Sequence, residues 1–170
     1  MFMLLIIFLF VFAVGVTIGG LLAAPREPVR PIHFLLFALF FLIMCYIGMI
    51  VGMFLSGWIS LIILEFVLAI LALLFMIATV TRFHPTLGFF HPEDRILVTM
   101  LSILFFLMGL EWGLLGFRTF FTITATFVFI VALLVGLFIQ QQICQILWRH
   151  SYIAFTPLIW LLFVTVLKLL

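Results

Sequence analysis

The chain of 170 residues is too apolar for a water-soluble protein. Hydrophobic residues make up 69% of it and charged residues 7%, whereas a soluble domain carries roughly a quarter charged residues. The net charge of +2 is small and its carriers are scattered, which argues against nucleic acid as a partner. The lipid bilayer is therefore the partner expected for most of the surface.

The first apolar run predicts a transmembrane helix over residues 2–24. It ends where Pro25, Pro28 and Pro31 remove backbone donors and break the helix. The small residues before Pro25 are similar to a signal-peptide cleavage site, but the run lacks the basic residues that open a secretory signal. We therefore expect this first span to be retained.

The second apolar run, from His33 to Val80, is about twice as long as one crossing requires. The chain must therefore turn near its middle. Ser56-Gly57-Trp58 is the best candidate, because glycine permits the bend and tryptophan favours the membrane interface. This turn divides the run into two predicted spans, residues 33–55 and 58–80.

A polar segment from Thr81 to Arg95 separates these spans from the apolar runs of the second half of the chain. Two spans, residues 96–116 and 119–147, are separated by a hinge around Gly116 and Arg118, and the last span covers residues 152–170. The sequence thus predicts an all-α, polytopic transmembrane helical bundle of about six spans. We expect residues 1–170 to form a single transmembrane domain.

The basic residues predict the orientation of the bundle. When the loops are assigned alternately to the two sides, the first side receives most of them: Arg26, Arg30, Arg82, Arg95 and Arg149. The second side receives only Arg118 and Lys168. The positive-inside rule places the first side in the cytoplasm. We therefore expect an integral protein of a plasma or inner membrane with both termini outside.

Pairs of glycines four residues apart predict close helix packing, because they let two helix backbones approach in lipid. The pattern occurs three times, at Gly15/Gly19, Gly48/Gly52 and Gly109/Gly113. Three such pairs on three different spans favour a compact bundle. We expect one of them to remain available for another chain.

Two carboxylates inside spans, Glu65 and Glu111, form the core of a candidate ion or proton site, because a charge within the membrane is costly. Each lies about seven residues from a predicted outer turn, and thus ~10 Å below the same surface at 1.5 Å per residue. Arg118 and Lys168 belong to the same side. The four residues are interpreted either as a protonatable or cation-binding vestibule, or as ion pairs that orient helices.

The histidines form a second candidate cluster at the predicted cytoplasmic rim, comprising His33, His84, His91 and His150. Four histidines on one side of the membrane suggest a metal or haem site. However, none of the four lies deep within a span, and no pair has the i, i+4 spacing of a helical metal site. We therefore expect no bound metal and no cofactor.

No catalytic or nucleotide-binding motif is present in the sequence, which favours a non-enzymatic protein. The glycine pairs and the short polar segments favour a subunit of a membrane complex, or a component that assembles with its own copies. The alternative is a small transporter or channel that uses the outward-facing carboxylates Glu65 and Glu111. A membrane enzyme acting at the histidine rim is a weaker third hypothesis.

Overall fold

The computed structural model describes residues 2–23, 31–82, 95–146 and 155–169, and these residues form six helices. The helices are α1 (Phe2–Ala23), α2 (Pro31–Leu55), α3 (Leu61–Thr81), α4 (Arg95–Leu114), α5 (Thr119–Ile146) and α6 (Thr156–Leu169). The described ranges contain no strand. The predicted all-α bundle of about six spans is therefore confirmed.

The first five helices are each long and apolar enough to cross a membrane. The sixth helix, α6, has 14 residues and rises about 21 Å at 1.5 Å per residue, less than the ~30 Å of a bilayer core. It is nevertheless an apolar helix. The chain is an integral membrane protein.

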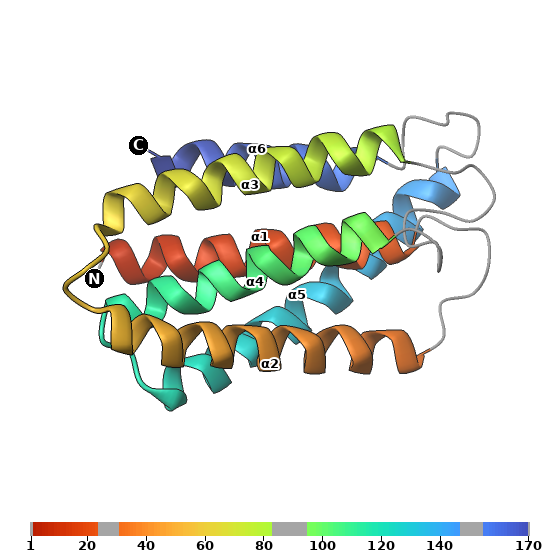
Figure 1. Ribbon diagram of the computed structural model, residues 1–170. Helices are drawn as coiled ribbons and strands as arrows, with labels where there is room; N and C mark the ends of the chain where they lie inside the picture. Colours follow the sequence, from red (N-terminus) through yellow and green to blue (C-terminus); the bar gives the residue numbers. More distant parts are fainter. Residues whose placement is uncertain (1, 24–30, 83–94, 147–154, 170) are drawn as a thin grey trace.

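Successive helices run in opposite directions, so that α1 begins and α6 ends at the same end of the bundle (Figure 1). We call this the terminal end. The α2–α3 and α4–α5 turns also lie there, and each contains a glycine with a positive φ, 97° at Gly57 and 76° at Gly116. These are the two turns that the sequence predicts. Glycine suits both positions because it adopts a positive φ without a steric penalty.

The helices pack in a closed ring, in the order α1, α5, α2, α4, α3, α6 and back to α1. The most extensive contacts join α1 to α5 and α2 to α4. Because helices two or four apart in the chain share a direction, both of these pairs are parallel (Figure 1). Among the contacts that form the ring, only α3–α4 joins helices that are consecutive in the chain. The ring is therefore a product of tertiary packing and not of chain order.

Aromatic side chains fill the centre of the ring. Phe41 of α2 stacks on Phe129 of α5 with ring centroids 4.1 Å apart, and both rings contact Phe105 of α4 edge-on. Trp112 of α4 is also buried and lies edge-on to Phe41. Lipid tails are as apolar as these side chains, so the gain from burial comes from close packing rather than from exclusion of water.

The two parallel pairs are held together by glycine seams. A Cβ at Gly109 of α4 would lie 2.0 Å from the carbonyl oxygen of Cys45 in α2, and one at Gly48 of α2 would lie 2.1 Å from that of Phe106 in α4. Similarly, a Cβ at Gly19 of α1 would lie 2.1 Å from the carbonyl oxygen of Leu133 in α5. Backbones this close leave no room for any side chain.

All three predicted glycine pairs are used within the chain. Gly48/Gly52 and Gly109/Gly113 face each other across the α2–α4 contact, while Gly15/Gly19 packs against α5. The expectation that one pair remains available for another chain is therefore wrong. The partner surface on α5 is a fourth small-residue pair, Ala132/Gly136, which has the same spacing and could have been recognised in the sequence.

Candidate ion or proton site

A buried ion pair joins Glu111 of α4 to Lys168 of α6 near the terminal end of the bundle. The Lys168 ammonium donates hydrogen bonds to both carboxylate oxygens of Glu111, with N–O distances of 2.6 and 2.7 Å. Both side chains are only 2% exposed. Because desolvated charges are costly unless they are paired with good geometry, this contact ties the two helices firmly together.

The surroundings of the pair are apolar and aromatic. The Lys168 ammonium lies 5.2 Å from the ring centroid of Phe10 in α1, a distance at which the ring face attracts a cation. Trp112 and Leu110, the neighbours of Glu111 in α4, are buried as well. Water is therefore largely excluded from the pair, and the charges interact in a low-dielectric environment.

The third acidic or basic residue of this region, Glu65, lies on the inward face of α3. It shares that face with Ala69, Ala72 and Met76, all of which are buried, at spacings of four, seven and eleven residues. Glu65 itself is half-buried, because it lies one turn after the start of α3 at Leu61. The Glu65 side chain therefore lies on the face of α3 that packs against the neighbouring helices of the ring.

The helices that flank α3 are α4 and α6, which carry the ion pair. Glu65 lies four residues after the start of α3, Glu111 three residues before the end of α4 and Lys168 one residue before the end of α6. All three therefore lie within about one turn of the terminal end. Glu65 thus lies at the depth of the ion pair, on the helix that packs against both α4 and α6.

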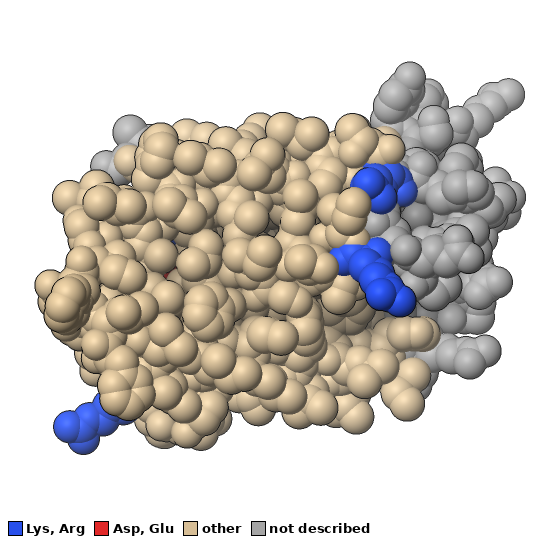
Figure 2. Space-filling model, viewed as in Figure 1, with Lys and Arg blue, Asp and Glu red and all other residues tan. Residues whose placement is uncertain are grey.

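The predicted fourth member, Arg118, is not part of this cluster. It is exposed in the α4–α5 turn, and the described residues offer its side chain no ion pair. Figure 2 shows basic side chains at both ends of a long, uncharged surface. Arg82 and Arg95 are exposed at the opposite end, where α3 ends and α4 begins, as the alternate assignment of loops predicts.

The histidine cluster is described only in part. His33 is exposed near the start of α2, whereas His84, His91 and His150 lie outside the described residues. Within the described ranges, no three histidine, cysteine, aspartate or glutamate side chains gather in a way that could hold a metal ion. The cysteines are free thiols, and Cys45 donates a hydrogen bond to the carbonyl oxygen of Phe105 across the α2–α4 contact.

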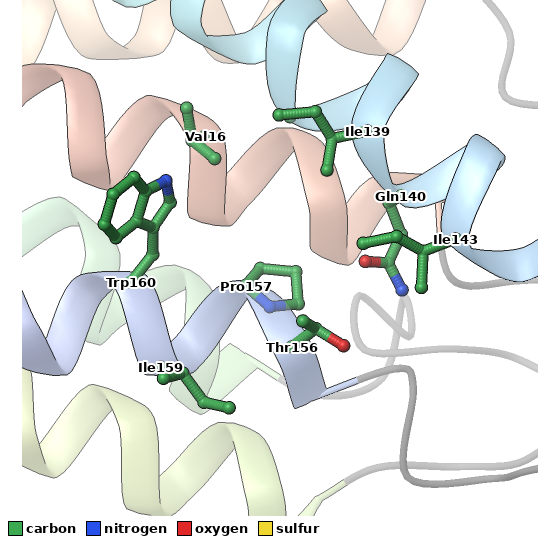
Figure 3. Close-up of a pocket in the computed structure, with 9 residues that line it drawn as sticks. Val16, Ile139, Gln140, Ile143, Thr156, Pro157, Ile159 and Trp160 are labelled. Carbon is green, nitrogen blue, oxygen red and sulfur yellow. The ribbon is translucent and has the colours of Figure 1, made fainter.

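A half-open apolar groove of about 280 Å³ lies at the other end of the bundle, where α5 and α6 hardly touch. Val16 of α1, Ile139 of α5 and Pro157 of α6 contribute to its walls, and the side chain of Gln140 lies at one edge (Figure 3). Gln140 is only 1% exposed and donates a hydrogen bond to the thiol of Cys144. Sequence reasoning missed this groove, since its lining has no pattern that distinguishes it from lipid-facing surface.

Comparisons of the chain with models of known protein families, with curated proteins and with solved structures found no match.

Proposed function

We propose that the protein is a non-enzymatic integral membrane protein that works as a component of a membrane complex, joined to other membrane chains or to copies of itself. The observation that supports this proposal is the filled interior. The centre of the ring is packed with aromatic side chains, and every described buried side-chain nitrogen or oxygen has a hydrogen-bond partner. Contacts with other molecules therefore fall on the outer faces of the helices.

The outer faces of α2 and α3 are the best candidates for such contacts. These two helices are the least covered of the five long spans. Their exposed side chains are large and apolar, for example Leu35 at 70% and Ile62 at 77% exposed. A partner helix would pack against these faces through van der Waals contact in place of lipid.

Photo-crosslinking in native membranes tests the proposal directly. A photoreactive amino acid at Ile62 should form a discrete crosslinked product with another chain or with a second copy. The matched control is Leu68 on the same helix, which is fully buried and should crosslink only within the chain. A protein that yields no intermolecular product from either α2 or α3, and that is a monomer without partners in mild detergent, would refute the proposal.

A second candidate function is that of a small transporter or channel, and the position of Glu65 favours it. A half-buried, inward-facing carboxylate beside a buried ion pair is the arrangement in which membrane proteins exchange ions or protons. This hypothesis predicts that purified protein in liposomes carries a cation or proton flux that Glu65→Gln abolishes. Glu93→Gln, which makes the same change in a predicted loop, should leave the flux intact.

A further inference from the structure

The two glycine seams of the bundle match residue by residue. In the α1–α5 seam a Cβ at Gly19 would meet the carbonyl oxygen of Leu133, and in the α2–α4 seam one at Gly113 would meet that of Met49. Two more contacts of the first seam recur in the second at the same shifts in residue number: Gly136 on Val16 as Gly52 on Leu110, and Gly15 on Phe129 as Gly109 on Cys45. One constant shift therefore relates α1 to α4, and a second relates α2 to α5.

The same correspondence holds for the whole ring. When α1 is exchanged with α4, α2 with α5 and α3 with α6, the α1–α5 contact becomes α4–α2 and the α1–α6 contact becomes α4–α3, while α2–α5 and α3–α6 map onto themselves. The exchange also reverses every helix, because α1 begins at the terminal end and α4 at the other (Figure 1). The first three helices and the last three are therefore related by a pseudo-two-fold axis in the membrane plane, as in the inverted repeats of many transporters.

The seams divide the ring into two bodies of three helices. We call α1, α5 and α6 the first body, and α4, α2 and α3 the second body. Within each body the seam brings two helix backbones into direct contact, and such close packing resists sliding. The bodies meet through the α2–α5 and α3–α6 contacts, which are less extensive than either seam. The boundary between the bodies is therefore the surface along which the bundle can move at the lowest cost.

Two contacts cross this boundary at different depths. Phe41 of the second body stacks on Phe129 of the first, near the middle of both helices. Glu111 of the second body pairs with Lys168 of the first at the terminal end. The shift that relates α4 to α1 takes Glu111 to Thr17, a residue that cannot form an ion pair. The ion pair therefore breaks the pseudo-symmetry and favours contact between the bodies at one end.

We propose that the two bodies rock against each other about the Phe41–Phe129 stack, and that the Glu111–Lys168 pair holds the terminal end closed. Because the pseudo-two-fold axis exchanges the two ends, closure at either end uses equivalent helix contacts, so that a second, oppositely tilted arrangement is accessible. Rocking of inverted repeats exposes one path to the two sides of a membrane in turn. The inference thus rests on the transporter candidate and deepens it, since the path would follow the boundary between the bodies.

Pulsed electron paramagnetic resonance on the full chain in lipid nanodiscs tests the proposal, because it measures the distance between two nitroxide labels. The labels are attached to introduced cysteines at exposed positions, after the native Cys45 and Cys144 have been replaced by alanine. A terminal pair and an opposite pair cross the boundary at the two ends, and an internal pair lies within the second body. The terminal pair is Phe54 with Val166, the opposite pair is Leu35 with Ile159, and the internal pair is Leu35 with Ile77.

The expected result is a movement that differs between the two ends. In the wild type both crossing pairs should give broader distance distributions than the internal pair. Lys168→Met should lengthen the terminal pair by about 2 Å or more, the scale of helix shifts at moving interfaces, and should shorten the opposite pair. The internal pair should stay unchanged. Arg118→Met, which removes an exposed cation at the same end, is the matched control and should change none of the three distances.

Three outcomes would overturn the proposal. The wild-type distributions of the crossing pairs could be as narrow as that of the internal pair, a result that needs no substitution of Lys168 and holds even if that variant does not fold. Lys168→Met could lengthen the crossing pairs at both ends, which would mean a general loosening, or could shift the internal pair equally, which would mean displacement of single helices. Because distances are measured without any transported species, rocking without flux would refute the transporter candidate alone, and flux without rocking would refute this inference alone.

Discussion

The ion pair between Glu111 and Lys168 is expected to be the strongest single polar contact that holds the bundle together, and Lys168→Met tests this. The pair is 2% exposed and makes two hydrogen bonds. Removal of one partner from such a buried pair typically costs about 3–5 kcal/mol, because the other charge is left uncompensated. Lys168→Met should therefore lower the free energy of unfolding by about that amount, measured by denaturant titration in mixed detergent micelles.

Because Glu65 lies at the same end of the bundle, Glu111→Met and Lys168→Met should differ in their cost to stability. In Glu111→Met, Lys168 can pair with Glu65 instead, whereas Lys168→Met leaves two carboxylates without a base. Glu111→Met should therefore cost less than Lys168→Met, and this difference should vanish in a Glu65→Gln background. The double substitution Glu111→Met with Lys168→Met should come within about 1 kcal/mol of wild type, because an apolar pair of similar volume replaces the ions.

Arg118→Met is the matched control, since it removes an exposed cation from the α4–α5 turn at the same end. A surface substitution of this kind should change stability by no more than about 0.5 kcal/mol. The reasoning is refuted if Lys168→Met costs no more than Arg118→Met. It is also refuted if the costs of the two single substitutions simply add in the double variant, because the pair would then contribute no coupling energy.

Three further predictions concern packing and topology. Gly109→Ala should separate α2 from α4, because its Cβ would lie 2.0 Å from a backbone oxygen, and a thermal unfolding measurement should register a loss of about 1–3 kcal/mol or more. Phe41→Leu, at a fully buried ring, should destabilise the protein more than Phe120→Leu, at a ring that is 80% exposed; equal effects would mean that the central aromatic cluster adds nothing to stability. Single cysteines at Ser56 and at Arg82, introduced without the native cysteines, should react with an impermeant reagent from opposite sides of the membrane, and labelling of both from one side would contradict the alternating helices.

The sequence by itself determines the helices of this protein and the depth of its charges. A bilayer needs about 20 apolar residues per crossing, so the lengths of the apolar runs already require turns near Gly57 and Gly116. The same arithmetic places Glu65 and Glu111 at equal depth on one side, and the structure has both near the terminal end. These conclusions follow from chain length and hydrophobicity, which are local properties.

Only the tertiary structure decides which helices are neighbours. In a soluble helix the apolar stripe marks the buried face, but in a membrane the interior and the lipid-facing surface are equally apolar, and periodicity loses this information. The sequence therefore does not distinguish Arg118 from Lys168 as the partner of the acids. Lys168 pairs with Glu111 because the ring order places α4 and α6 on either side of α3, whereas Arg118 is exposed in the α4–α5 turn.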